Sequence, residues 1–117
     1  MAAVKPLWDA LYAYNADVVV NANSTVYERF APQSPTAVAD PLGIREFIVG
    51  TGGSGLQNPG DPRANSEVRN GTTYGIIKFV LDTAELRVGI RADRRLGIHG
   101  RQGQPRCHTR IGSLPLT

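Results

Sequence analysis

The chain has 117 residues, of which 41% are hydrophobic and 20% charged, and a formal net charge of +3. This length fits one small domain that buries about two thirds of its surface on folding. No apolar stretch approaches the roughly twenty residues that a membrane span needs, and no basic segment precedes an apolar core at the N-terminus, so we expect neither membrane contact nor a signal peptide.

Positive charge is concentrated near the C-terminus. Residues 1–85 carry six basic and nine acidic side chains, whereas residues 86–117 carry seven arginines against Asp93 alone. A basic segment of this kind indicates nucleic acid or an acidic surface as partner. The segment has no aromatic residue that could stack on bases, so nucleic-acid binding is the less favoured interpretation.

The first predicted element is a short helix that begins near Pro6 and ends at Asn15. Proline suits the first turn of a helix, and asparagine can end one in the left-handed conformation. Four apolar side chains share one face at helical spacing: Leu7, Trp8, Leu11 and Tyr12. This stripe predicts a helix that packs on the core.

Val18–Val20 is a short apolar run followed by a polar loop. Such a run is typical of a buried parallel strand, and ligands commonly bind in the loop at the carboxyl end of such strands. The long loop that comes next contains Pro32, Pro35 and Pro41, which exclude a regular ladder. Residues 45–49 then predict a second strand.

Gly50, Gly52 and Gly55 match the spacing of a dinucleotide-binding motif. That motif requires a helix directly after the glycines, and Pro59 and Pro62 stand where its first turns would be. We therefore predict a glycine-rich loop that lets backbone pass close to a neighbouring site.

Residues 58–72 are predicted to be irregular, with a turn at Asn70-Gly71. Apolar residues alternate in 73–81 and again in 86–90, which predicts a hairpin connected by residues 82–85. One helix and about four strands, with an irregular basic tail, indicate an α/β or α+β-like fold.

Three segments carry a family resemblance: Y-E-R-F-A-P-Q from Tyr27, G-I-R-E-F-I-V-G-T-G-G from Gly43, and S-E-V-R-N-G-T-T-Y-G from Ser66. Together they closely resemble the C-terminal part of calcineurin-like metallophosphoesterases, in the bacterial group similar to purple acid phosphatases. The resemblance covers about residues 5–84. It implies a truncated fragment: a partial two-layer sandwich over residues 1–91, and an unstructured basic tail over residues 92–117.

In that family the loop after the strand reads G-H-x-H-x-Y-E-R, and its two histidines bind metal. Asn23 and Thr25 occupy the two histidine positions here, while Tyr27, Glu28 and Arg29 are retained. The resemblance implies iron, zinc or manganese ions, but amide and hydroxyl oxygens bind such ions weakly. The D-x-H, G-D-x-x-Y and G-N-H-E motifs that supply the family's other ligands do not occur. We therefore assign no metal ligand and no catalytic residue.

Arg29, with Tyr27 and Glu28, is the candidate contact for a phosphate oxygen. The alternative is structural, with Tyr27 packed and Glu28 and Arg29 paired behind the former site. The resemblance implies a phosphoric-ester hydrolase of the acid phosphatase or phytase kind, acting on phosphomonoesters; members of the family are often secreted. The other interpretations are an inactive fragment that binds phosphate or a partner, and a nucleic-acid-binding protein that uses its basic tail.

The chain departs from the family pattern beyond Arg91. Permitted codons for residues 85–108, read one base later, can encode S-Y-E-W-E-F-V-P-I-A-G-S-G-F-T-D, which is the type of ending that the family has. We therefore hypothesise a frameshift near Ala84 or Glu85. Cys107, His99 and His108 match no usual zinc spacing.

A sheet that lacks its other half also predicts self-association or marginal stability.

Overall fold

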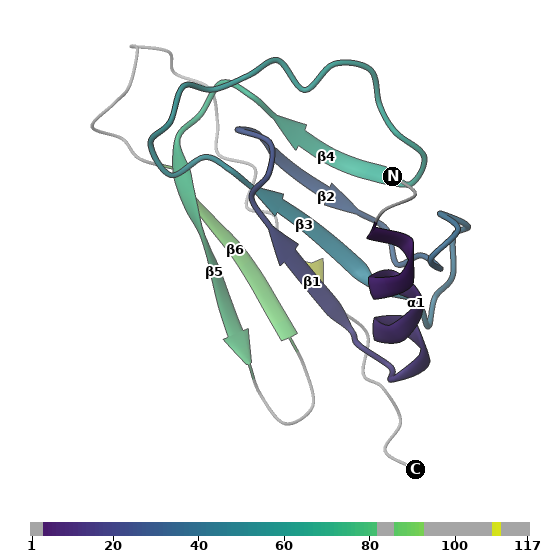
Figure 1. Cartoon of the computed structure of the whole chain (residues 1–117). Helices are drawn as coiled ribbons and strands as arrows, with labels where there is room; N and C mark the ends of the chain where they lie inside the picture. Colours follow the sequence, from purple (N-terminus) through teal and green to yellow (C-terminus); the bar gives the residue numbers. More distant parts are fainter. Residues whose placement is uncertain (1–3, 82–85, 93–108, 111–117) are drawn as a thin grey trace. The chain divides into compact units, whose positions relative to one another are not determined.

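The computed structural model describes residues 4–81, 86–92 and 109–110 (Figure 1). These residues form one helix and seven strands, arranged in a four-stranded and a three-stranded sheet. The chain divides into two compact units, Met1–Thr72 and Thr73–Thr117. The fold is thus a small mixed α+β structure, as the element pattern predicts, although the number of strands exceeds the predicted four.

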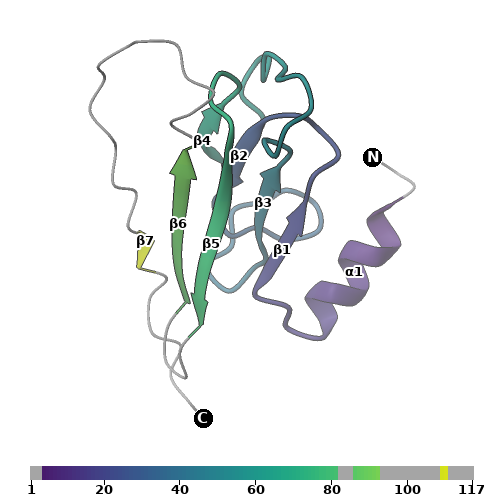
Figure 2. The ribbon, with the colours of Figure 1, turned by 90° about the vertical axis from the view of Figure 1, so that its left-hand side faces the viewer.

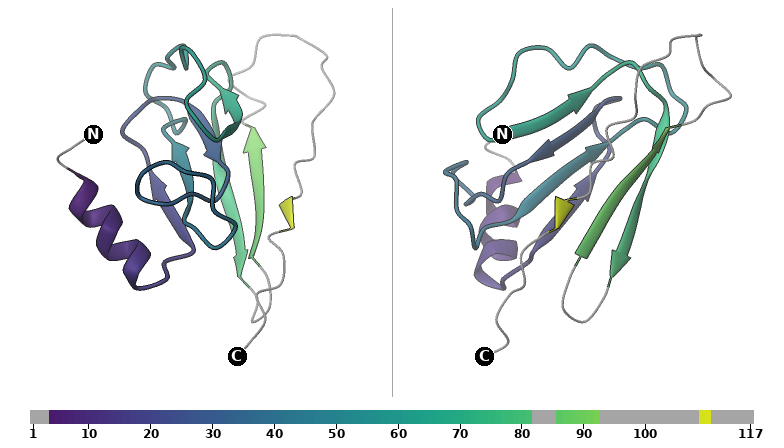
Figure 3. Two further views of the ribbon diagram at one scale, coloured as in Figure 1. Left: turned by 90° about the vertical axis from the view of Figure 1, so that its right-hand side faces the viewer. Right: turned by 180° about the vertical axis from the view of Figure 1, so that it is seen from behind.

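The first unit consists of a helix on one face of a sheet (Figures 1 and 3). Its elements are α1 (Lys5–Ala13), β1 (Val18–Asn21), β2 (Tyr27–Phe30), β3 (Arg45–Val49) and β4 (Ser66–Asn70). The strand order is β1-β3-β2-β4. β1 runs parallel to β3, and β2 is antiparallel to both of its neighbours, β3 and β4.

α1 ends as predicted. Asn15 adopts the left-handed conformation with φ 56°. Its N–H donates to the Tyr12 carbonyl at 3.1 Å, and the Ala16 N–H donates to the Leu11 carbonyl at 2.9 Å. These two bonds satisfy carbonyl groups that the last turn of a helix leaves without intrahelical partners.

The apolar stripe of α1 is less buried than predicted. Leu7 is 61% exposed and Tyr12 37% exposed, and only Trp8 and Leu11 are half-buried. Leu7 lines a cleft between the helix and the sheet, described below, whereas Tyr12 does not. The prediction of a core-packing helix is therefore wrong for half of the stripe.

β1 confirms the predicted parallel strand, with Val18 opposite Arg45 and Asn21 opposite Ile48 of β3. However, β1 is the outer strand of its sheet. Val20 is consequently 49% exposed, so the predicted full burial of this strand is wrong.

The core of the first unit lies on β2 and β3. Val26, Phe30 and Ile48 form a buried cluster, and Ile44 and Phe47 are fully buried. All four residues of β2 are buried because this strand lies between β3 and β4.

β2 and β4 are not predicted from the sequence. Two adjacent charged residues interrupt the apolar pattern of β2, and Val68 is the only apolar residue in β4. These strands form because they pair with each other, with Glu28 opposite Arg69. The prediction that all of 58–72 is irregular is wrong for residues 66–70.

Gly50 confirms the predicted close approach of backbone. A Cβ atom at this position would collide with the backbone of Ser24, and the Gly50 N–H donates to the Val26 carbonyl at 2.9 Å. Residues 51–65 contain no helix, in agreement with our rejection of the dinucleotide motif. The proline-rich loop forms only isolated bridges, from Gln33 to Ala39 and Ile44.

The second unit is a hairpin with one short added strand (Figures 2 and 3). β5 (Gly75–Leu81) pairs with β6 (Leu86–Ala92), and β6 pairs with β7 (Thr109–Arg110). Exposed and half-buried side chains alternate along Gly75–Val80, which confirms the predicted strand. The predicted connection 82–85 and most of the predicted tail 92–117 lie outside the described residues. The described part of the chain has no helix with the length and apolar character of a bilayer span.

Candidate functional site

A cleft of about 970 Å³ lies within the first unit, between α1 and one face of the sheet. Its apolar lining includes Leu7, Trp8, Leu11, Val19, Phe30 and Ile48. Its polar lining includes Lys5, Asn21, Asn23, Glu46 and Arg63. A largely apolar cleft with a few polar groups is the usual form of a small-molecule site.

Strand alternation places the polar groups of the cleft. Side chains two residues apart on a strand share a face, so Glu46 and Ile48 lie on the same side of β3. Ile48 is opposite Asn21 of β1 and opposite Glu28 of β2. Three neighbouring strands therefore bring Asn21, Glu46 and Glu28 together around Ile48.

Glu46 is a half-buried carboxylate in the lining of this cleft. The Asn21 Nδ2 donates to its Oε1 at 2.6 Å. Burial raises the pKa of Glu46, and the charge of Glu28 adds to this rise, whereas the Asn21 hydrogen bond and the charge of Arg63 oppose it. A carboxyl with a shifted pKa inside a cleft is a common feature of functional sites.

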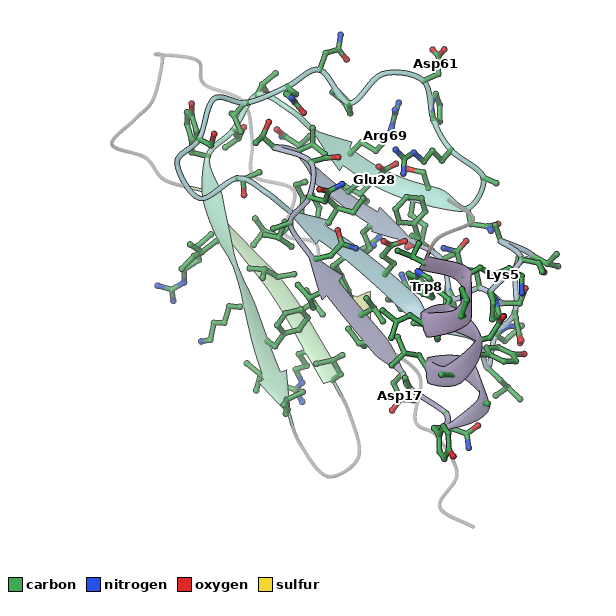
Figure 4. All side chains as sticks on the ribbon, viewed as in Figure 1. Lys5, Trp8, Asp17, Glu28, Asp61 and Arg69 are labelled. Carbon is green, nitrogen blue, oxygen red and sulfur yellow. The ribbon has the colours of Figure 1, made fainter. Side chains whose placement is uncertain are left out.

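Glu28 lies deeper than Glu46. It is only 4% exposed, and its Oε1 has no hydrogen-bond partner among the described residues. Buried polar atoms are normally hydrogen-bonded, so this oxygen is an unusual feature. Figure 4 labels Glu28 on the sheet and Trp8 on α1.

Asn23 and Thr25, which the resemblance equates with metal-ligand positions, follow the carboxyl end of β1. Asn23 is exposed at the cleft, whereas Thr25 is half-buried and its Oγ1 has no hydrogen-bond partner in the described structure. Within the described ranges, no group of three or more His, Cys, Asp or Glu side chains is placed to hold a metal ion. One amide and one hydroxyl do not fit the expected iron, zinc or manganese ions.

The structure does not bring the three candidate phosphate contacts together. Tyr27 and Arg29 are on one face of β2, and Glu28 is on the other. Tyr27 is packed, with 6% of its surface exposed. Arg29 is 9% exposed and its Nε donates to Glu67 Oε2 at 2.9 Å, so its carboxylate partner is on β4.

Glu67 also binds a second arginine. Arg45 donates from Nη1 to Glu67 Oε2 at 2.7 Å and to the Phe30 carbonyl at 3.0 Å. Arg29 and Arg45 thus share one carboxylate and join β2, β3 and β4. This arrangement gives Arg29 a structural partner and favours the structural interpretation of this residue.

The set of residues around the cleft, Asn21, Glu46, Trp8 and Arg63, is not recognisable from the sequence. The available signal is the alternation of β1 and β3 together with their parallel pairing, which puts Asn21 beside Glu46. The possible zinc residues His99, Cys107 and His108 lie outside the described residues.

Comparison with known proteins adds no further assignment. No protein-family model, curated protein or solved structure matches this chain.

Proposed function

We propose that this chain is the C-terminal part of a calcineurin-like metallophosphoesterase domain, of the group similar to purple acid phosphatases. By descent it is a phosphoric-ester hydrolase module of the acid phosphatase or phytase kind. In this chain the ligand loop, residues 22–26, cannot hold the catalytic metal ions by itself. Its own activity is therefore the binding of a partner, at the exposed outer strand β1, rather than phosphate-ester turnover.

One observation carries the family proposal. The three segments that resemble the family form three adjacent strands, β3, β2 and β4, in one sheet. Segments that are distant in sequence and share a family pattern are expected to pack together in that family's fold. In addition, Gly50 of the second segment contacts the ligand loop at Ser24. This contact supports a ligand loop held in a fixed position.

The donor atoms carry the proposal about activity. Two metal ions in such a site would supply an activated hydroxide and stabilise an in-line displacement. Asn23 and Thr25 give only one weakly coordinating amide and one neutral hydroxyl, so no hydrolytic step is derived for the described residues.

A second candidate is phosphomonoester hydrolysis with metal ions that are held jointly with donors from another polypeptide. The buried Thr25 Oγ1, which has no hydrogen-bond partner among the described residues, favours this candidate because it lies at a family ligand position. Turnover that requires added metal and a second polypeptide would single it out.

Restoring the histidines tests the proposed role of the loop. The Asn23→His, Thr25→His double variant is expected to bind zinc at least about tenfold more tightly than the unmodified chain, because two imidazoles replace weak ligands. Isothermal titration calorimetry with zinc alone measures this affinity.

The matched control is the Gly52→His, Ser54→His variant, which has the same two-residue spacing in an exposed loop. Both positions are exposed, and a Cβ at Gly52 meets no other atom within 4 Å. Equal zinc affinity of the two double variants would contradict the assignment of residues 22–26 as the ligand loop.

A further inference from the structure

The chain bends at Gly71 and Thr72, directly after β4. Asn70 is the last residue of β4 and pairs with Tyr27 of β2. Its side-chain Oδ1 accepts two hydrogen bonds from Thr72, one from the backbone N–H at 2.8 Å and one from Oγ1 at 3.4 Å. The side-chain amide of Asn70 is thus held against the backbone two residues further on, in an Asx turn.

This geometry activates the side-chain amide of Asn70. When the backbone nitrogen of the next residue attacks Cγ of an asparagine, negative charge develops on Oδ1. Hydrogen-bond donors that already point at this oxygen stabilise the charge, as the donors of an oxyanion hole do. Thr72 supplies two such donors, so the turn lowers the barrier for the attack.

The attacking nitrogen belongs to Gly71. Glycine has no side chain, so the approach of its nitrogen to Cγ is unobstructed. The fold requires glycine at this position, because a Cβ would collide with the Gln57 carbonyl and with the ring of Pro59. The packing of the turn on residues 57–59 therefore keeps an Asn-Gly pair at the end of β4.

The other asparagines lack this combination. The chain has six asparagines, and only Asn70 precedes glycine. Asn58 is the nearest comparison, because its Oδ1 accepts a hydrogen bond from the Gly60 N–H at 3.0 Å. However, Pro59 follows Asn58, and proline has no N–H that could supply a nucleophile. The remaining four precede alanine or serine: Asn15, Asn21, Asn23 and Asn65.

We propose that Asn70 is a site of spontaneous deamidation. The Gly71 nitrogen loses its proton and forms a bond to Cγ of Asn70, the Cγ–Nδ2 bond breaks, and ammonia leaves a five-membered succinimide ring. One water molecule then opens the ring. Cleavage between Cγ and the nitrogen gives aspartate, and cleavage between the backbone carbonyl carbon and the nitrogen gives isoaspartate. The reaction consumes one water, releases one ammonia and involves no oxidation or reduction.

Both products change the end of β4. Aspartate adds a negative charge there, and isoaspartate adds one methylene group to the main chain at the residue that pairs with Tyr27. The modification thus converts the chain slowly and irreversibly into two altered forms. This proposal goes beyond the proposed function, because it involves neither the outer strand β1 nor the ligand loop.

Peptide mapping by mass spectrometry tests the proposal on the folded, unmodified chain during incubation at neutral pH. It follows the replacement of the amide NH₂ by OH at each asparagine and separates aspartate from isoaspartate. We expect conversion of Asn70 to both products, at least about tenfold faster than at any other asparagine, and no succinimide products at Asn58. Conversion of Asn70 that is no faster than that of Asn23 or Asn65, or that gives aspartate without isoaspartate, would overturn the proposal.

A variant tests the contribution of the turn. Thr72→Val keeps the shape and the backbone N–H but removes the Oγ1 donor, so it is expected to slow the conversion of Asn70 about threefold. Thr36→Val is the control, because it removes an exposed threonine hydroxyl that is hydrogen-bonded to Ser34 instead. Equal rates in the two variants would contradict the role assigned to Thr72. The ranking of the six asparagines in the unmodified chain decides the proposal if Thr72→Val does not fold.

Discussion

Glu46 links the local environment of one side chain to the stability of the fold. Its pKa in the folded chain is raised from the ordinary value of 4.5, mainly by burial. The folded state therefore binds a proton more tightly than the unfolded state, and stability falls as the pH rises through the interval between the two pKa values. The cleft is thus built around a carboxylate that costs stability when it is ionised.

The Glu46→Gln variant tests this link. It is expected to be more stable than the unmodified chain at pH 7. It is also expected to keep its stability as the pH rises from the ordinary pKa of a glutamate to the raised pKa of Glu46, where the unmodified chain loses stability. Urea unfolding at a series of pH values measures both effects. A variant that is less stable at pH 7, with the same pH dependence as the unmodified chain, would contradict the assigned cost of the buried charge.

Tyr12 and Asp40 connect α1 to the loop before β3. The Tyr12 hydroxyl donates to Asp40 Oδ2 at 2.5 Å, and this bond, with that from the Leu42 N–H, holds the pKa of Asp40 below its ordinary value of 3.8. The ionised Asp40 carboxylate therefore stabilises the fold at pH values above its ordinary pKa. This contribution is lost as the pH falls through the lowered pKa of Asp40.

In the Tyr12→Phe variant we expect the pKa of Asp40 to rise toward 3.8, because its largest lowering contribution is removed. An NMR titration of the Asp40 carboxyl measures this value directly. Both side chains are largely solvated, so only a small effect on stability is expected. An unchanged pKa of Asp40 would show that this hydrogen bond does not hold α1 to the loop in solution.

Single residues also show what the sequence reveals about the site. Asn23 and Thr25 can be placed from the sequence, because their position follows from a strand, a loop and an intact Y-E-R motif. The pairing of Asn21 with Glu46, and the proximity of Glu28, depend on strand register across three segments. Register is a tertiary property that no local pattern in this chain specifies.

At the scale of elements, the strongest sequence signals are α1, β1, β3 and the β5–β6 hairpin. Each has either a cap or an apolar periodicity, and local chemistry is enough to predict it. β2 and β4 have neither, because β2 contains Glu28 and Arg29 at its centre and β4 is mostly polar. They become strands through pairing and through the Arg29–Glu67 ion pair, which the sequence alone does not show.

Gly50, directly after β3, lies against the backbone of the loop formed by residues 22–26. The Gly50→Ala substitution is expected to destabilise the chain by about 1–3 kcal/mol, because the new methyl group would overlap the backbone of Ser24. Gly52→Ala is the control, since a Cβ at that position meets no atom within 4 Å. Urea unfolding of both variants measures the difference. Equal stability of the two would mean that the ligand loop is not packed on Gly50.

At the scale of the whole molecule, β1 is an outer strand with an exposed Val20. Outer strands of this kind pair readily with a second chain. We therefore predict self-association that increases with concentration, measured by sedimentation velocity. Val20→Lys is expected to weaken it, because a charged side chain on an outer strand opposes pairing. A chain that is monomeric at all concentrations would contradict this prediction.

We propose that the chain keeps a phosphoesterase-like scaffold and lacks a metal centre of its own. The most direct test is turnover of an aryl phosphate by highly purified protein, before and after chelation and after return of iron, zinc or manganese. A parallel sample carries Asn23→Ala, Thr25→Ala and Arg29→Ala. We predict no turnover above that of a mock purification under any condition. Turnover that disappears with the chelator, returns with metal and is absent in the triple variant would contradict it.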